Sequence, residues 1–223
     1  LPHIEWAINT QIMRHFPTFL QVHASVLEVD GQGVIFPASP SSGKTTLAMG
    51  LLARGWRYLS DEFALIHPET LQLHPYPKAL CIKEGSFRYA QELGLLRGRW
   101  KAYLKGSKGR VTFLNPHHVR PDAVAAPCPV RHVVFCRYAP GEQPLLEPIP
   151  RAEAVIRLNL NSFNFLKFRG RGLATFVDVV KRARCYELRS GPLAATCDLI
   201  ESTILGRQSG AGNDGAADNG CRS

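Results

Sequence analysis

The chain has 223 residues, 45% of them hydrophobic, which is enough apolar material for one ordinary globular core. Lys and Arg total 27 against 18 for Asp and Glu, and the formal charge of +9 favours an anionic partner such as phosphate, an acidic peptide or nucleic acid. No apolar run reaches the length of a bilayer span, the N-terminus lacks the order of a secretion signal, and the six cysteines contain no C-x-x-C pair. We therefore expect a cytoplasmic protein with reduced thiols, no membrane association and no cysteine-based metal site.

The first third of the chain alternates helix and strand signals. Apolar residues at steps of four predict a helix over Ile4 to Phe16. Two β-branched runs joined by Asp30-Gly31-Gln32-Gly33 predict a hairpin. We expect a helix over Lys44 to Arg54, ended by Gly55, and then a buried strand over Tyr58 to Ile66 that two acids interrupt.

The remainder begins with an irregular segment. Residues 74–129 are rich in proline and contain the basic stretch LRGRWKAYLKGSKGR, which predicts a mobile basic loop with a short helix over Phe87 to Leu95. Regular structure then resumes with strands over 130–138 and 185–188 and helices over 151–160, 172–181 and 193–205. Residues 206–223 are small and polar and are expected to be a disordered tail, so residues 1–205 form the one predicted domain.

One short motif predicts phosphate chemistry. The stretch ASPSSGKT ends in Gly43-Lys44-Thr45, the second half of the phosphate-binding pattern G-x-x-x-x-G-K-[ST], and lies between a predicted strand and a predicted helix. In that pattern backbone N–H groups face phosphate oxygens, the lysine reaches the β- and γ-phosphates, and the hydroxyl helps to hold Mg²⁺. Ala38 stands at the first glycine position, where positive φ would cost a methyl-bearing residue about 1–2 kcal/mol.

The alternative is a Ser/Gly-rich turn that reads GKT by chance. The flanking apolar strand and amphipathic helix favour the phosphate-binding interpretation. The next buried strand also carries Asp61-Glu62, where an acid could complete the coordination of Mg²⁺. We therefore predict that the chain binds a nucleotide.

The stretch VHASVLEVDGQGVIFPASPSSGKTTLAMGLLARGWRYLSDEFALI resembles the core of bacterial HPr kinase/phosphorylase. The shared order is a V-H-G strand, a hairpin, a phosphate-binding loop, a helix ending in arginine-glycine and a strand ending in paired acids. The stretches KGRVTFLNP and NSFNF resemble more closely the divergent branch of HPr-kinase-related kinases. The resemblance spans roughly residues 3 to 205 and implies an α/β P-loop kinase domain of HPr kinase type, with a mixed central sheet flanked by helices.

The resemblance also implies roles for individual residues. Lys44 and Thr45 would keep the roles that the motif gives them. Asp61 and Glu62 would divide between activating the acceptor hydroxyl and holding the metal, and His23, matching the V-H-G histidine, would lie beside the phosphates. The residues expected to surround the phosphates are Ser39, Pro40, Ser41, Ser42, Gly43, Lys44, Thr45 and Thr46, and those expected near Mg²⁺ are Thr45, Asp61 and Glu62.

Two of these roles stay open. Asp61 is our choice for the base, because a carboxylate in a mostly apolar strand can have its pKa raised towards useful values; it could instead be a plain metal ligand. His23 could be a core histidine without a role in the reaction.

Several residues outside the motif could also contribute. Lys101, Lys105, Lys108 and Arg110 could form a lid over a triphosphate or grip an acidic substrate, or could simply be a solvated loop; Arg88 and Arg131 could act in the same way. The segment Asn161-Ser162-Phe163-Asn164 resembles an element of the related branch, but a helix-end cap with packed aromatics explains it as well.

The sequence therefore predicts an ATP- and Mg²⁺-dependent kinase that transfers the γ-phosphate to a hydroxyl, and the resemblance points to a serine of a small protein or peptide. Two rivals stay open, a kinase for a small metabolite and a nucleotide-sensing module without turnover. A nucleic-acid partner is not expected, because only the charge suggests one. A homo-oligomer would agree with the resemblance, which is to a ring-forming family.

Overall fold

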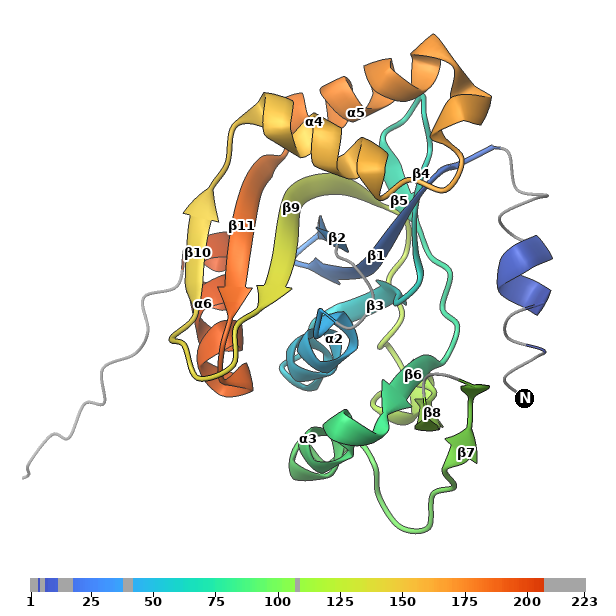
Figure 1. Cartoon of the computed structure of the whole chain (residues 1–223), viewed down its shortest axis with the longest axis vertical. Helices are drawn as coiled ribbons and strands as arrows, with labels where there is room; N and C mark the ends of the chain where they lie inside the picture. The colour runs from blue at the N-terminus through green and yellow to red at the C-terminus, as the bar shows by residue number, and fades with distance from the viewer. Residues whose placement is uncertain (1–3, 5–6, 12–17, 38–41, 107–108, 207–223) are drawn as a thin grey trace, which may run out of the picture.

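The computed structural model describes residues 4, 7–11, 18–37, 42–106 and 109–206. A mixed sheet lies at the centre, with helices on both of its faces (Figure 1). Its strands are β1 (Leu20–Val29), β2 (Gln32–Pro37), β3 (Arg57–Ser60), β4 (Phe63–Ile66), β5 (Gln72–His74), β9 (Cys128–Tyr138), β10 (Leu145–Pro148) and β11 (Arg184–Ser190). The flanking helices are α2 (Lys44–Ala53), α4 (Arg151–Leu160), α5 (Gly170–Arg182) and α6 (Leu193–Leu205). The prediction of a mixed sheet flanked by helices is confirmed.

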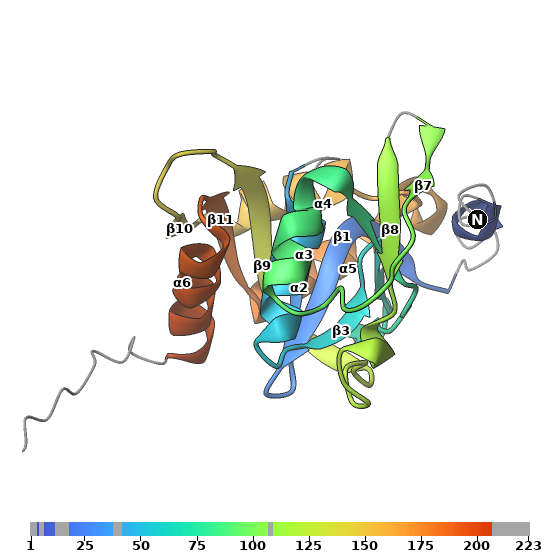
Figure 2. The ribbon, with the colours of Figure 1, turned by 90° about the horizontal axis from the view of Figure 1, so that it is seen from below.

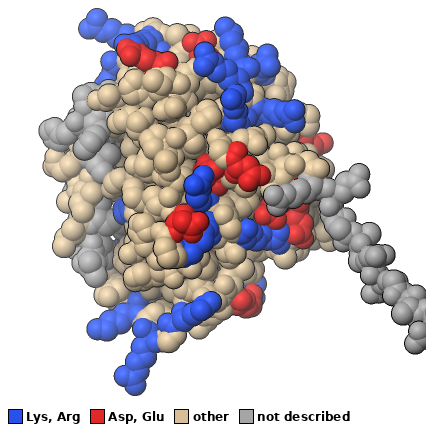
Figure 3. All heavy atoms as spheres, turned by 180° about the vertical axis from the view of Figure 1, so that it is seen from behind, with Lys and Arg blue, Asp and Glu red and all other residues tan. Residues whose placement is uncertain are grey.

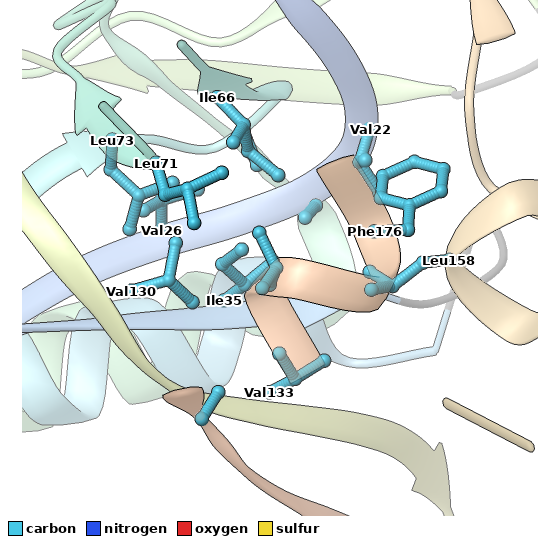
Figure 4. Packing of buried hydrophobic residues seen from close by; sticks show 14 of the residues in the cluster. Val22, Val26, Ile35, Ile66, Leu71, Leu73, Val130, Val133, Leu158 and Phe176 are labelled. Atoms are coloured by element: carbon cyan, nitrogen blue, oxygen red, sulfur yellow. The ribbon is translucent and has the colours of Figure 1, made fainter. Parts of the chain in front are cut away.

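Two apolar cores hold the helices against the sheet. One face of the sheet packs on α4 and α5, through residues such as Leu158 and Phe176, which meet Val22 and Ile35 from the strands (Figure 4). The other face packs on α2 and α6. Sandwiching the sheet in this way buries both sides of β1 and β2, which explains why these strands read as continuous apolar runs.

Strand β1 organises the sheet, because it pairs antiparallel with β2, β3 and β4. The β1–β2 hairpin turns through Asp30 and Gly31, whose φ values of 49° and 76° suit the two-residue turns that follow strand twist. β9 lies parallel to β2 and β11, while its first residues pair antiparallel with β5. The sheet therefore closes on itself at one end and stays open at β10.

The buried strand expected over Tyr58 to Ile66, interrupted by two acids, forms in the structure as two separate strands. The chain breaks between β3 and β4 at Asp61 and Glu62. The Ser60 hydroxyl accepts hydrogen bonds from the N–H groups of Glu62 and Phe63, at 3.2 and 3.0 Å, which turns the backbone out of the ladder. The two acids therefore project from a bend at the rim of the sheet.

The loop expected over residues 74–129 is wrong in part, because eleven of these residues form a second, three-stranded sheet. The order of this small sheet is β6 (Leu80–Lys83), β8 (Arg110–Leu114) and β7 (Tyr103–Leu104). Short helices accompany it: η1 (Glu84–Ser86), η3 (Pro116–His118) and α3 (Phe87–Glu92), the last being shorter than expected. Leu80, Ile82 and Val111 are fully buried beneath it, so a few alternating apolar residues suffice to anchor the sheet.

The other expected elements match the structure closely. α4, α6 and β9 occupy their predicted places, α5 and β11 are somewhat longer than predicted, and α2 ends before Gly55, whose φ is 100°. Residue 4 and residues 7–11 are helical, while the rest of the predicted N-terminal helix, residues 38–41 and the tail from 207 onward lie outside the described residues. Among the described helices, none combines the length and apolar character needed to cross a bilayer.

Candidate active site

A cavity of about 890 Å³ lies where the start of α2, the β3–β4 bend and the small sheet meet. Seen from below, α3 and β8 lie in front of α2 and β1 (Figure 2). The walls come from distant parts of the chain: His23, Ser42, Gly43, Lys44, Thr45, Thr46, Leu47, Asp61, Glu62, Cys81, Lys83, Glu84, Gly85, Ser86, Arg88, Tyr89, Gly109, Arg110, Tyr138, Phe163, Ser190, Gly191, Leu193 and Thr196. Eight predicted site residues from three sequence segments thus share one cavity: His23, Ser42, Gly43, Lys44, Thr45, Thr46, Asp61 and Glu62.

The start of α2 is built to face an anion. Gly43 precedes the helix with φ 86° and ψ 2°, a left-handed conformation that strains any residue with a side chain. No side chain caps the helix and its first turn carries no acid, so its leading N–H groups and dipole direct positive charge into the cavity. The Ser42 hydroxyl is buried and has no hydrogen-bond partner among the described residues. Ser39, Pro40 and Ser41, expected around the phosphates, lie outside the described residues.

Asp61 joins the acid pair to the phosphate motif. The Thr45 hydroxyl donates to one Asp61 carboxylate oxygen at 2.8 Å, and the Ser25 hydroxyl donates to the other. Burial raises the pKa of Asp61 to about 6, and it does so against the two hydroxyl bonds and the Lys44 charge, which favour the ionised form. A carboxyl group with this pKa is ionised at neutral pH yet can accept a proton readily.

Lys44 lies close to the same acids. Lys44 is only 8% exposed, and lysine is rarely buried to this extent. Burial lowers the pKa of Lys44, while the charges of Asp61 and Glu62 raise it. A negatively charged ligand in the cavity would, like Asp61 and Glu62, favour the charged form of this buried ammonium group.

Glu62 has different surroundings from Asp61. Its carboxylate lies 3.1 Å from the Lys78 ammonium, and both side chains are partly exposed. The two acids are therefore distinct: Asp61 is bound to hydroxyls of β1 and α2, whereas Glu62 faces a lysine of the segment after β5.

His23 lies on β1, opposite Phe63 of β4. Its ring stands 5.6 Å from that of Phe163, centroid to centroid, and both side chains line the cavity. His23 therefore lines the same cavity as Lys44 and Asp61.

The small sheet adds a basic wall, which we define as Lys83, Arg88 and Arg110. The Arg110 guanidinium lies 2.9 Å from the Glu84 carboxylate, and the Arg88 guanidinium donates to the Tyr89 hydroxyl at 2.6 Å. Arg88 and Arg110 are among the residues considered for a basic lid, whereas Lys83 was not predicted.

The other basic residues proposed for that lid do not line the cavity. Lys105 lies 5.8 Å above the Phe113 ring, Lys101 is exposed elsewhere, and Arg131 is on β9 beside His132. Lys108 is outside the described residues.

Sequence reasoning missed two hydroxyl contacts at the site. Ser25 is fully buried and lies two residues after His23, so both side chains are on the same face of the strand. A serine on the same face as His23 in an otherwise apolar strand is the sequence feature that could have indicated its place at the site. Ser86 lies 2.6 Å from the Thr46 hydroxyl, oxygen to oxygen, and links the small sheet to α2. Nothing in the sequence near Ser86 distinguishes it from an ordinary turn residue.

The oxygen atoms available here suit Mg²⁺ better than a softer metal. The Thr45 hydroxyl and the Asp61 carboxylate lie together beside Glu62, and hard oxygen ligands in small number are what Mg²⁺ takes from a protein when phosphates supply the rest. Within the described part of the chain no group of three or more His, Cys, Asp or Glu could hold a metal by itself. The residues therefore fit a metal that arrives with a phosphate ligand.

Comparison with known proteins gives limited results. No family model matches the chain, and no curated protein matches it either. Among solved structures, the chain is similar to the HPr(Ser) kinase/phosphatase from Coxiella burnetii, with 15% sequence identity and a TM-score of 0.43. The match covers 83% of this chain and 88% of that one.

Proposed function

We propose that this chain is an ATP- and Mg²⁺-dependent kinase that transfers the γ-phosphate to a hydroxyl group, with a serine of a small protein or peptide as the acceptor. The observation that carries the proposal is the 2.8 Å hydrogen bond from Thr45 to Asp61, made in a cavity that also holds Lys44. The bond links the phosphate-binding half-motif to an acid 16 residues later, which a chance GKT sequence would not do.

The residues of the chain divide the work of phosphoryl transfer between them. The N-terminus of α2 and the Lys44 ammonium would bind the β- and γ-phosphates, with the buried Ser42 hydroxyl available as a further donor. Thr45 and one acid of the pair Asp61 and Glu62 would hold Mg²⁺, which when bound neutralises charge on the γ-phosphate. The basic wall would meet the phosphates or an acidic acceptor from the opposite side.

Asp61 would also accept the proton of the acceptor hydroxyl. In the transfer, the acceptor oxygen loses its proton to the carboxylate and forms a bond to the γ-phosphorus, while the bond from that phosphorus to the β–γ bridging oxygen breaks and ADP leaves. Glu62, paired with Lys78, would line the acceptor end of the cavity, and His23 would stand beside it.

The test is transfer from γ-labelled ATP to proteins and small molecules of an extract, comparing wild type with Lys44→Ala and Asp61→Asn. Both variants should lose transfer, and Asp61→Asn should still bind ATP in a titration. Asp178→Asn, which removes an exposed acid of α5, is the matched control and should keep full activity.

The possible outcomes separate the rival functions. A labelled small molecule in place of a labelled protein would make the chain a metabolite kinase. ATP binding without any transfer would favour a nucleotide sensor. ATP binding that is unchanged in Lys44→Ala would refute the phosphate-site assignment.

A further inference from the structure

The proposed reaction gives no role to the segment Asn161–Asn164, although this segment is firmly attached beside the cavity. The Phe163 N–H donates to the Gln21 carbonyl at 2.9 Å, and the His23 N–H donates to the Asn161 carbonyl at 2.8 Å. The Ser162 hydroxyl donates to the same Gln21 carbonyl at 3.1 Å. These bonds lay the segment, which we call the Asn161–Asn164 shelf, along β1 as a short additional edge.

The side chain of Asn164 fixes the shelf further. Its carbonyl oxygen accepts from the Gln21 N–H, and its amide donates to the Phe19 carbonyl, both at 2.9 Å. Asn164 is only 3% exposed, so both bonds are protected from water and hold more firmly than surface bonds would. The backbone that carries Phe163 is therefore held in one position relative to β1.

Phe163 occupies the mouth of the cavity next to the acids. Its ring packs against Phe63, which directly follows Glu62, at a centroid distance of 5.3 Å and close to edge-on. Nevertheless 46% of the residue remains exposed. A rigid shelf thus presents half of an aromatic ring to whatever enters the acceptor end.

Further exposed apolar residues lie close to Phe163 in the sequence, on α4 and η4. Ile156 and Leu160, one turn apart on α4, are 60% and 77% exposed, and Leu166 of η4 (Phe165–Phe168) is 87% exposed. Of ten large hydrophobic residues exposed in the described part of the chain, five lie between positions 156 and 173. A concentration of this kind marks an interaction surface.

Basic side chains border this apolar surface. Lys167 and Arg169 are exposed on and just after η4. Lys and Arg are exposed at the upper end of the molecule, where α4 and α5 lie, with a few acids among them, and they are exposed at its lower end as well (Figure 3). A partner that covers the surface therefore gains from acidic groups next to its apolar ones.

The geometry points to a docking surface for the acceptor polypeptide, made of Phe163, Leu160 and Leu166 with Lys167 and Arg169 at its border; this inference rests on the proposed kinase function. An apolar side chain of the acceptor packs on Phe163, and acidic residues nearby meet the basic border. A polypeptide that brings its hydroxyl to Asp61 passes the shelf, whereas a small metabolite fits inside the cavity and leaves this surface uncovered.

The experiment uses synthetic peptides with one central serine, in which single flanking positions are fixed in turn as Leu, Phe, Glu, Lys or Gly. Transfer from labelled ATP is measured, and fluorescein-labelled copies of the same peptides are titrated in a separate binding assay. Wild type should prefer Leu or Phe over Gly by about fivefold at one flanking position, since covering half an aromatic ring is worth about 1 kcal/mol. It should also prefer Glu over Lys at a further position.

Phe163→Ser and Leu160→Ser should each reduce the apolar preference below about twofold. Leu160 does not line the cavity, so Leu160→Ser should leave the affinity for ATP unchanged. Leu145→Ser, at an exposed leucine on the edge strand β10, is the matched control and should keep the preference. Thermal unfolding shows whether each variant is folded, and Phe163→Leu, which keeps an apolar side chain, should retain most of the preference.

Failure of the docking surface and failure of the proposed function give different results. Transfer to peptides without an apolar preference would overturn the docking surface and leave the kinase standing. A preference seen in binding, and lost in both serine variants, would uphold the surface even without transfer. A complete lack of peptide binding would overturn the inference. A dimer in sedimentation that Leu160→Ser converts to a monomer would also overturn it, because another copy of the chain would then cover the surface.

Discussion

Replacing His132 with glutamine should reduce the loss of folding stability that we expect between pH 7 and pH 5. His132 lies on β9, is 4% exposed, and is stacked on Tyr186 of β11. Its Nε2 atom lies 3.2 Å from the Gln32 side-chain oxygen, and its buried Nδ1 atom has no partner among the described residues. Burial lowers the pKa of His132 to about 4, and the charges of Arg184 and Arg131 add to the effect.

The sign and the magnitude follow from linkage. The folded protein keeps His132 neutral, whereas the unfolded chain takes up a proton at about pH 6.5, so the contribution to stability is full above that pH and is lost as pH falls towards 4. At about 1.36 kcal/mol per pKa unit, the free energy of unfolding should drop by about 2 kcal/mol between pH 7 and pH 5 because of this residue alone.

The measurement is urea unfolding of wild type and His132→Gln at a series of pH values, comparing differences between the two proteins so that the carboxyl groups cancel. His118→Gln, at an exposed histidine, is the control and should follow wild type. Parallel stability curves for wild type and His132→Gln would refute the reasoning, because they would mean that the fold does not disfavour the charged ring.

Four further predictions concern the site and its supports. Thr45→Val should weaken Mg²⁺-dependent ATP binding about tenfold in calorimetry, and Thr45→Ser should restore most of it because the hydroxyl that meets Asp61 is kept. The rate of transfer should fall as pH drops through about 6, where Asp61 takes up a proton, and a pH–kcat/KM profile flat down to pH 5 would contradict the role of this acid as base. Gly50→Val should lower the free energy of unfolding by about 1–3 kcal/mol, because a Cβ atom at this position would lie 2.8 Å from Cys197 Sγ and would push α2 away from α6. The control is Gly85→Ala, which should change the free energy of unfolding little because a Cβ atom there meets no neighbouring atom. Asn164→Ala should lower the free energy of unfolding in urea by about 1–3 kcal/mol and, by loosening the shelf, should also weaken the peptide preference. An unchanged preference would mean that these two bonds stabilise the fold without positioning Phe163 for the peptide.

The parts of the site that sequence reasoning found are those encoded by local patterns. A glycine before an apolar helix predicts the start of α2, and two acids in an apolar run predict a polar position near it. The interruption at the acids was predicted, but the bend that turns them towards the cavity was not. This bend depends on the Ser60 hydroxyl accepting from two N–H groups, which the presence of a serine in a strand does not predict. Local periodicity therefore located Asp61 but not its geometry.

The basic wall could not be predicted for a different reason. Its residues lie on β6, α3 and β8, and β6 and β8 pair although 26 residues separate the end of one from the start of the other. Strands of four and five residues are too short for alternation to stand out, and the glycines and prolines between them imitate a loop. Only the long-range pairing shows that Arg88 and Arg110 share a cavity with Lys44.

Strand β1 accounts for how these separate pieces meet. Its His23 pairs with Phe63 and its Val26 pairs with Ser60, so the bend with Asp61 and Glu62 must fall beside Ala24 and Ser25. The same strand holds the Asn161–Asn164 shelf through Gln21 and His23. Substitutions in β1 should therefore disturb transfer and peptide docking together, whereas changes on the shelf alone should affect the acceptor and leave the affinity for ATP intact. A Phe163 variant that weakened ATP binding as much as peptide binding would mean that the two ends of the cavity are not independent.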